Sequence, residues 1–181
     1  GEVPRLFPEN EPFVLDRARV LTLAGDTIDS PTDVLVLTSG ILTEEALRAV
    51  PALQEAGVAV THLHISTLKP FTDPMVARAL AATTGAVITM ENHTITGGLG
   101  SAVAETMAET GATAPLHRIG LKDTYAHGAS QAHLLREYDL DAFSLIRTTE
   151  VALDRSLGID AADLAPVRIA ATHSAAKVEA L

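Results

Sequence analysis

The sequence contains no cysteine and no tryptophan. The absence of cysteine excludes disulfide bonds, thiol catalysis and metal sites built from thiolates. Aromatic residues make up only 3% of a chain that is 47% hydrophobic, so the core must consist mainly of valine, isoleucine, leucine and alanine. With 181 residues, the chain is long enough to bury such a core as one domain.

Positive charge is also scarce. The chain carries 13 lysine and arginine residues against 23 aspartate and glutamate residues, a net charge of −10, and the basic residues form no cluster along the sequence. Nucleic acids and anionic membranes attract basic patches, so neither is an expected partner. No apolar run approaches the roughly 20 residues of a membrane-spanning helix. We expect a cytoplasmic protein.

Apolar runs alternate with helix signals along the chain. Strands are predicted at residues 17–23, 33–38, 58–65, 86–90 and 116–120, and helices at 43–56, 73–83, 98–110, 131–138 and 141–157. This alternation is typical of a three-layer α/β/α fold with a mostly parallel five-stranded sheet that carries one antiparallel strand. The short turn between the first two strands favours an antiparallel pairing of these two.

Local signals mark the starts of two helices. Thr43 is expected to cap the first helix, with Glu44 and Glu45 as solvated side chains in its positive first turn. Pro51 lies inside this helix, where a proline removes a hydrogen bond and produces a kink. The pair Asp73-Pro74 predicts a second start, because a capping carboxylate followed by proline is typical of a helix N-terminus.

The densest polar chemistry lies in residues 91–101, which we call the elbow. It begins with Glu91-Asn92-His93 at the carboxyl end of a predicted parallel strand, where open α/β sheets bind ligands. Glu91 and His93, two positions apart, could act as acid and base. Alternatively, Glu91 and Asn92 hydrogen-bond the loop backbone while His93 packs at a domain surface.

A glycine cluster follows, formed by Gly97, Gly98 and Gly100 and succeeded by Ser101. Gly98 and Gly100 match two positions of a dinucleotide-binding fingerprint, but Val103 stands at the third. The glycines therefore indicate a tight backbone and close packing of helix on strand. The helix N-terminus at this point could also hold an anion or a carboxylate from elsewhere in the chain.

The histidines do not predict a metal site. His62 and His64 lie on one face of a predicted strand, but a metal ion needs three or four ligands. No ligand spacing connects the remaining candidates, which are His93, His117, His127 and His133. Ser101 lacks the surroundings of a serine nucleophile elbow. We therefore predict no catalytic residue, no cofactor-binding residue and no metal ligand in this chain.

Several segments together resemble the C-terminal domain of transketolase-like thiamine diphosphate enzymes. They are residues 91–105, with Glu-Asn-His followed by Gly-Gly-Leu-Gly, and residues 64–71, 118–123 and 134–140. The resemblance covers roughly residues 13–155. The C-terminal domains of 1-deoxyxylulose-5-phosphate synthase and of the beta subunits of 2-oxo-acid dehydrogenases are similar but less close.

The resemblance implies an enzyme that transfers a two-carbon ketol unit between sugar phosphates. Such enzymes hold thiamine diphosphate and a divalent metal, Mg²⁺, between a diphosphate-binding and a pyrimidine-binding domain, usually in a homodimer. Residues 1–12 would be the linker from the pyrimidine-binding domain, 13–157 the C-terminal domain, and 158–181 a partly mobile extension in which Asp160 caps a short helix. This chain alone would bind no cofactor and would be inactive.

In this reading the elbow is an interdomain or dimer surface, carried by Glu91, Asn92, His93, Gly97, Gly98, Gly100 and Ser101. The alternative is a stand-alone regulatory or small-anion-binding module that uses the same elbow.

Overall fold

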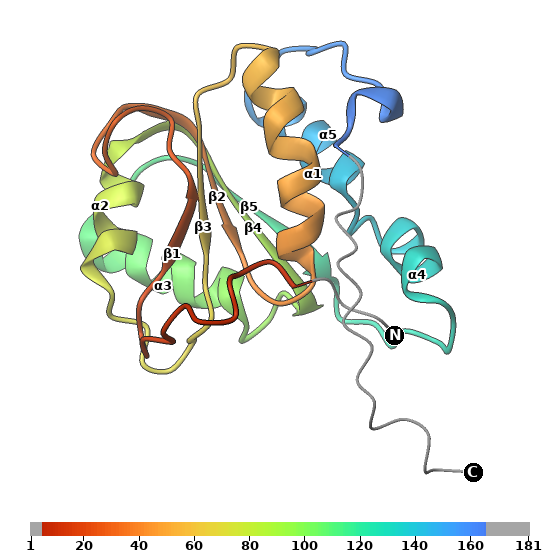
Figure 1. Ribbon diagram of the computed structural model, residues 1–181, viewed down its shortest axis with the longest axis horizontal. Helices are drawn as coiled ribbons and strands as arrows, with labels where there is room; N and C mark the ends of the chain where they lie inside the picture. Colours follow the sequence, from red (N-terminus) through yellow and green to blue (C-terminus); the bar gives the residue numbers. More distant parts are fainter. Residues whose placement is uncertain (1–4, 166–181) are drawn as a thin grey trace.

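A computed structural model describes residues 5–165. A five-stranded sheet lies between helices on both of its faces (Figure 1). The strands are β1 (Arg19–Thr22), β2 (Thr32–Thr38), β3 (Val60–His64), β4 (Thr83–Thr94) and β5 (Leu116–Leu121). The helices are α1 (Leu42–Glu55), α2 (Pro74–Ala82), α3 (Leu99–Thr110), α4 (Gln131–Glu137) and α5 (Ala142–Ala152), followed by a 3₁₀ turn at Ala161–Asp163. The predicted α/β alternation is confirmed.

The strand order is β1-β3-β2-β4-β5, with β2 to β5 parallel and β1 antiparallel to β3. The sequence correctly predicts one antiparallel strand, but the expected pairing of β1 with β2 is wrong. β2 instead lies between β3 and β4 at the centre of the sheet, where Leu35 and Leu37 are fully buried under helices. Val20 on β1 is 42% exposed, which suits an edge strand.

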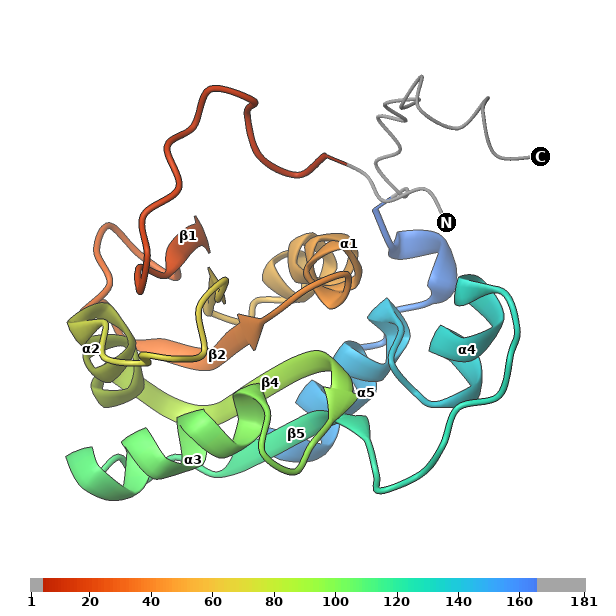
Figure 2. The same ribbon diagram turned by 90° about the horizontal axis from the view of Figure 1, so that it is seen from below.

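The alternation of side chains along the strands divides the core in two. Val34 and Val36 of β2 face α1 and α5, whereas Leu35 and Leu37 face α2 and α3. Figure 2 shows the resulting three layers, with α1 and α5 on one side of the sheet and α2 and α3 on the other. No helix within residues 5–165 is both long enough and apolar enough to cross a membrane.

The start of α1 differs from the prediction. Ile41 precedes the helix without a capping side chain, while Thr43 is buried and its hydroxyl donates to Thr38 Oγ1 at 3.0 Å. Glu44 and Glu45 are 7% and 6% exposed, so the expectation of solvated carboxylates is wrong. They are buried because the start of α1 packs beside α5. Pro51 lies inside a helix that continues to Glu55.

Asp73 caps α2 as predicted, and its Oδ1 accepts a hydrogen bond from the Met75 amide at 3.0 Å. The largest differences in element bounds are in β4 and α5. β4 extends to Thr94, so the first residues of the elbow are still strand, and α5 ends at Ala152 rather than near residue 157.

The segments that flank the domain pack onto it where the structure describes them. The Phe7 ring lies 5.1 Å from the His64 ring and 4.1 Å from the Arg19 guanidinium. At the other end, the Ala165 amide donates to the Arg48 carbonyl of α1 at 3.1 Å. The Asp160 amide donates to Asp163 Oδ2 at 2.7 Å. The mobility expected for the extension concerns residues 166–181, which lie outside the described residues.

Candidate functional site

The elbow begins at the end of β4, which lies beside β2 in the sheet. The chain leaves these two neighbouring strands toward opposite faces of the sheet. β2 leads through α1 to β3 on one side, and β4 leads through α3 to β5 on the other, with the two helices on opposite faces (Figures 1 and 2). In doubly wound sheets, the carboxyl ends of two such strands form the crevice that binds ligands. The elbow was therefore correctly placed at the edge where ligand sites occur.

In this chain, contacts within the protein join the ends of β2 and β4. Gly40 follows β2 with a φ of +59°, and the Asn92 side-chain oxygen fills the space where a Cβ on residue 40 would be. The Ser39 amide donates to the Met90 carbonyl at 3.0 Å, which joins the ends of β2 and β4.

The Glu91 carboxylate occupies the N-terminus of α3. Glu91 is 2% exposed, and its two oxygens accept hydrogen bonds from the amides of Leu99 at 2.8 Å and Gly100 at 2.9 Å. The amides at a helix N-terminus are the groups that would otherwise bind an external anion. The sequence left open whether an external anion or a carboxylate of the chain lies at this helix N-terminus. The structure shows the carboxylate of Glu91 there.

The glycines of the elbow make this contact sterically possible. A Cβ on Gly98 would collide with the Glu91 carboxylate, and a Cβ on Gly100 would lie 2.6 Å from Arg118 Cδ. Ser101 completes the turn, because its hydroxyl accepts from the Gly97 amide at 2.9 Å and donates to the Ile95 carbonyl at 3.2 Å. The turn is thus held by hydrogen bonds and contacts within the chain.

His93 does not pair with Glu91. Its side chain is exposed, and Nδ1 lies 3.2 Å from the Thr94 carbonyl oxygen. Because both Glu91 oxygens bond to α3, the structure does not form the acid–base pair that the spacing allowed. Asn92 and His93 are the exposed residues at the start of the elbow.

A buried polar network beside the elbow was missed by the sequence analysis. His62 is fully buried, and its Nε2 lies 2.9 Å from Thr38 Oγ1. Thr43 Oγ1 donates to Thr38 and lies 2.8 Å from His64 Nδ1. Burial and the neighbouring His64 lower the pKa of His62 to about 3. Burial and the charge of Arg19 lower the pKa of His64 to about 4, so both rings are neutral at pH 7.

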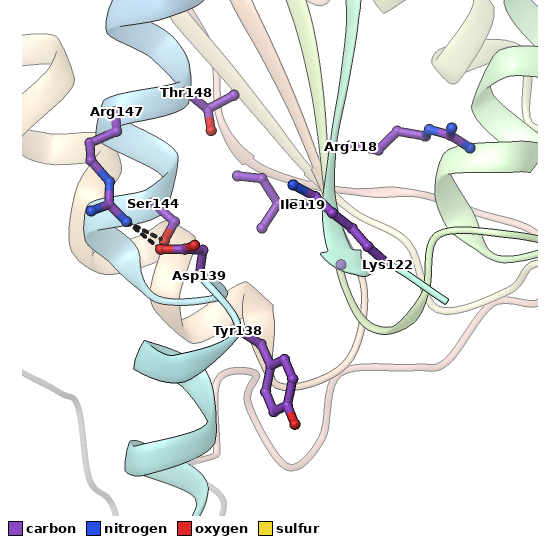
Figure 3. A pocket seen from close by; sticks show the side chains of 9 residues that line it. Arg118, Ile119, Lys122, Tyr138, Asp139, Ser144, Arg147 and Thr148 are labelled. Carbon is purple, nitrogen blue, oxygen red and sulfur yellow. Dashed lines mark hydrogen bonds and ion pairs between the residues drawn. The ribbon is translucent and has the colours of Figure 1, made fainter. Parts of the chain in front are cut away.

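A polar cavity of about 340 Å³ lies between α5 and the carboxyl end of β5 (Figure 3). Its lining residues are Arg118, Ile119, Gly120, Lys122, Tyr138, Asp139, Ser144, Arg147 and Thr148. The Lys122 side chain points into the cavity, and Arg118 points away from it toward α3. Arg147 donates to Asp139 at 2.7 Å and to Ser144 at 3.2 Å.

The sequence contained one signal for this cavity. Lys122 directly follows β5 and therefore stands at the edge of the sheet where ligand sites occur. Arg118, Ile119 and Gly120 lie on β5 itself. The remaining lining residues follow α4 or lie on α5, and no local pattern connects these segments to β5.

Comparison with known proteins agrees with this architecture. The family model "Transketolase, C-terminal domain" matches residues 25–145. The chain is 35% identical over 151 residues to the 6-deoxy-6-sulfo-D-fructose transketolase subunit SqwH of Clostridium sp. (strain MSTE9), covering 83% of this chain and 44% of that protein. It is 34% identical over 137 residues to the 1-deoxy-D-xylulose-5-phosphate synthase of Thermomicrobium roseum, covering 75% of this chain and 22% of that enzyme.

A solved structure, described as a split-gene transketolase in an inactive β4 tetramer, superimposes with a TM-score of 0.72 at 33% identity. The superposition covers 84% of this chain and 47% of that one. This chain thus spans less than half the length of each of these relatives. The family match and the shared fold confirm the resemblance seen in the elbow: the chain belongs to the transketolase C-terminal-domain family.

Proposed function

We propose that this chain serves as the assembly domain of a thiamine diphosphate-dependent enzyme that transfers a two-carbon ketol unit between sugar phosphates. Its partners would be the diphosphate-binding and pyrimidine-binding domains or subunits of the same enzyme, within a homodimer of the complete protein. The family membership and the short span of the chain relative to its relatives support this proposal.

One observation carries the proposal: the carboxylate of Glu91 fills the anion position at the N-terminus of α3. A diphosphate at this position would displace or oppose that buried negative charge, which is electrostatically unfavourable. The elbow therefore does not fit the diphosphate of thiamine diphosphate, with which its Mg²⁺ would be bound. We assign both to the domains outside this chain.

Exposed apolar residues support docking of the preceding domain. Phe13, Val14 and Leu15 are 63%, 53% and 61% exposed, and Val20 on the edge strand and Leu68 are each 42% exposed. Phe13, Val14 and Leu15 are neighbours in sequence, and exposed apolar patches are typical of protein–protein contact surfaces. In this proposal residues 1–12 form the linker, residues 13–157 the domain, and the exposed Asn92 and His93 extend the interface to the elbow.

The test is an assay of ketol transfer from a ketose phosphate to an aldose phosphate. The chain alone is expected to show no turnover, and activity is expected when the diphosphate-binding and pyrimidine-binding domains are added with thiamine diphosphate and Mg²⁺. Turnover by the isolated chain would overturn the proposal. The cytoplasmic location expected from the sequence stays a prediction, and fractionation of the producing cells would check it.

The cavity at Lys122 favours a second candidate, a small-anion-binding module. The Lys122 ammonium points into the cavity of a protein with a net charge of −10, so an anion would be attracted locally. Calorimetry with sugar phosphates, thiamine diphosphate and nucleotides distinguishes this candidate from the first. Saturable binding that Lys122→Ala abolishes would support the anion-binding module. If no ligand gives a heat of binding, only the assembly role remains.

A further inference from the structure

Two histidines and a glutamate meet on the exposed surface of α4. His133 and Glu137 lie one helical turn apart on that helix, and His127 comes from residues 122–130, which connect β5 to α4. One nitrogen from each imidazole and one carboxylate oxygen lie within 4.8 Å of one another. The fold thus brings together three metal-ligating side chains from two different segments.

The spacing matches a metal coordination shell. His127 Nε2 lies 3.5 Å from Glu137 Oε2, and His133 Nε2 lies 3.2 Å from the same oxygen. Zinc bonds to imidazole and carboxylate of about 2.1 Å, in tetrahedral geometry, separate neighbouring ligand atoms by about 3.4 Å. Two of the three ligand–ligand distances are therefore within about 0.2 Å of the edge of a zinc tetrahedron.

The orientation of the rings fits the same interpretation. The two imidazole planes are inclined by 68°, with their centroids 6.2 Å apart, so both Nε2 atoms converge on one oxygen without ring stacking. An isolated surface ion pair between histidine and glutamate contributes little stability, and it requires only one histidine. With the second histidine, the cluster offers the three protein ligands that a zinc ion needs in addition to a water molecule.

Accessibility and donor chemistry define the class of ion. The side chains of His127, His133 and Glu137 are 55%, 57% and 37% exposed, so an ion can reach them without opening the fold. Two nitrogen donors and one oxygen donor suit zinc and neighbouring transition metals, whereas Mg²⁺ and Ca²⁺ prefer sites made of oxygen. Three protein ligands leave a fourth position for water or for a donor from another chain.

We propose that His127, His133 and Glu137 form a binding site for a divalent transition-metal ion, with Zn²⁺ as the expected ion. The bound ion would fix the connecting residues 122–130 against α4. Because Lys122 is the first of these residues and lines the polar cavity, the ion would also restrict motion at that cavity. This site is distinct from the Mg²⁺ assigned above to the proposed diphosphate-binding and pyrimidine-binding domains, and it does not depend on the proposed ketol transfer.

The test is titration of the full chain, without a polyhistidine tag, with ZnCl₂ in a calorimeter and with CoCl₂ in a visible spectrophotometer. We expect one ion per chain and the intense visible absorption of four-coordinate cobalt. His127→Gln, His133→Gln and Glu137→Gln should each weaken zinc binding at least about tenfold. The matched control is His93→Gln, an exposed histidine outside the cluster, which should bind zinc like the wild type.

Absence of saturable binding up to about 1 mM zinc, or equal loss of binding in the control, would overturn the site. Limited trypsin digestion provides a second readout, because Lys122 begins the connecting segment. Zinc should slow cleavage after Lys122 in the wild type and not in His127→Gln. Zinc binding with unchanged cleavage at Lys122 would overturn the tie between this segment and α4.

Discussion

The carboxylate of Glu91 lies against Gly98, in the space that a Cβ atom on residue 98 would occupy. From this position it accepts hydrogen bonds from the amides of Leu99 and Gly100, so the end of β4 holds the start of α3. The elbow is therefore a joint between strand and helix, built from one buried charge and one missing side chain.

Glu91→Ala should lower the free energy of unfolding by roughly 2–3 kcal/mol, because two buried amides lose a charged acceptor. Urea denaturation monitored by circular dichroism measures this change. The matched control is Glu105→Ala, an exposed carboxylate on the same helix, which should stay within about 0.5 kcal/mol of the wild type. Equal effects of the two substitutions would contradict the capping role.

Gly98→Ala should destabilise the chain by about 1–3 kcal/mol, because the new methyl group meets the Glu91 carboxylate. In a Glu91→Ala background the same substitution should cost less, since the colliding group is gone. A double-mutant cycle of urea unfolding measures this coupling. Gly128→Ala, where a Cβ meets nothing within 4 Å, is the neutral control. Additive effects at positions 91 and 98 would contradict the contact.

The buried His62 should make the chain sensitive to mild acid. Its folded pKa is about 3, whereas an imidazole in the unfolded chain titrates near 6.5. Between these values only the unfolded state takes up the proton, so stability falls as the pH drops below about 6.5. The loss is about 1.4 kcal/mol per pH unit for this residue.

Urea unfolding at pH 6.5 and at pH 5 measures how much the free energy of unfolding changes per pH unit. His62→Gln should lower stability at pH 7, because it alters a fully buried site, but should make the pH dependence shallower, leaving the part that the lowered pKa of His64 contributes. The exposed His93→Gln should keep the wild-type slope. A His62→Gln variant with the full wild-type slope would show that another group is responsible.

Substitution by glutamine should change the stability of the fold in opposite directions at Glu44 and Glu45, which are adjacent on α1. Burial and the charge of Glu45 raise the pKa of Glu44, and within residues 5–165 Glu44 Oε1 has no hydrogen-bond partner. Ionised Glu44 therefore destabilises the folded chain as the pH rises above about 4.5. Glu44→Gln should raise the free energy of unfolding at pH 7, on the order of 1 kcal/mol, and this gain should vanish below about pH 4.

Glu45→Gln should instead lower stability at pH 7. Glu45 Oε2 accepts hydrogen bonds from the Ala142 amide at 2.8 Å and from Arg48 at 2.9 Å. Thermal and urea unfolding at pH 7 and pH 4 measure both variants. Destabilisation by Glu44→Gln at pH 7 would contradict the interpretation of its unpartnered carboxylate.

His93→Ala should weaken assembly of the complete enzyme more than it weakens cofactor affinity, because His93 is exposed on the proposed interface and its side chain, within residues 5–165, forms hydrogen bonds with Thr94 alone. Light scattering against protein concentration measures assembly, and titration with thiamine diphosphate measures affinity. Glu109→Ala, exposed near the opposite end of α3, is the control. A loss of cofactor affinity at unchanged assembly would contradict the interface.

The sequence predicts those features that depend on neighbours close along the chain. Asp73 is two residues from the Met75 amide that it caps, and the apolar run of β2 by itself requires a strand covered on both faces. The glycine cluster predicted close packing of α3 on the sheet for the same reason, because a missing side chain has a local steric consequence. These signals were sufficient for the three-layer fold and for the family resemblance.

Partners far apart in the sequence could not be predicted in this way. The burial of Glu45 depends on Ala142, 97 positions away, and the metal-ligand cluster depends on the path of residues 122–130 back to α4. β1 pairs with β3 rather than with β2, its neighbour in sequence, and β2 pairs with β3 and β4, so the edge position of β1 depends on strands that follow it in the chain.

Local patterns thus determined the elements, their order and the family. Only the tertiary structure decided which buried polar groups meet, because hydrogen bonds and charges act between neighbours in space, whatever their separation along the chain.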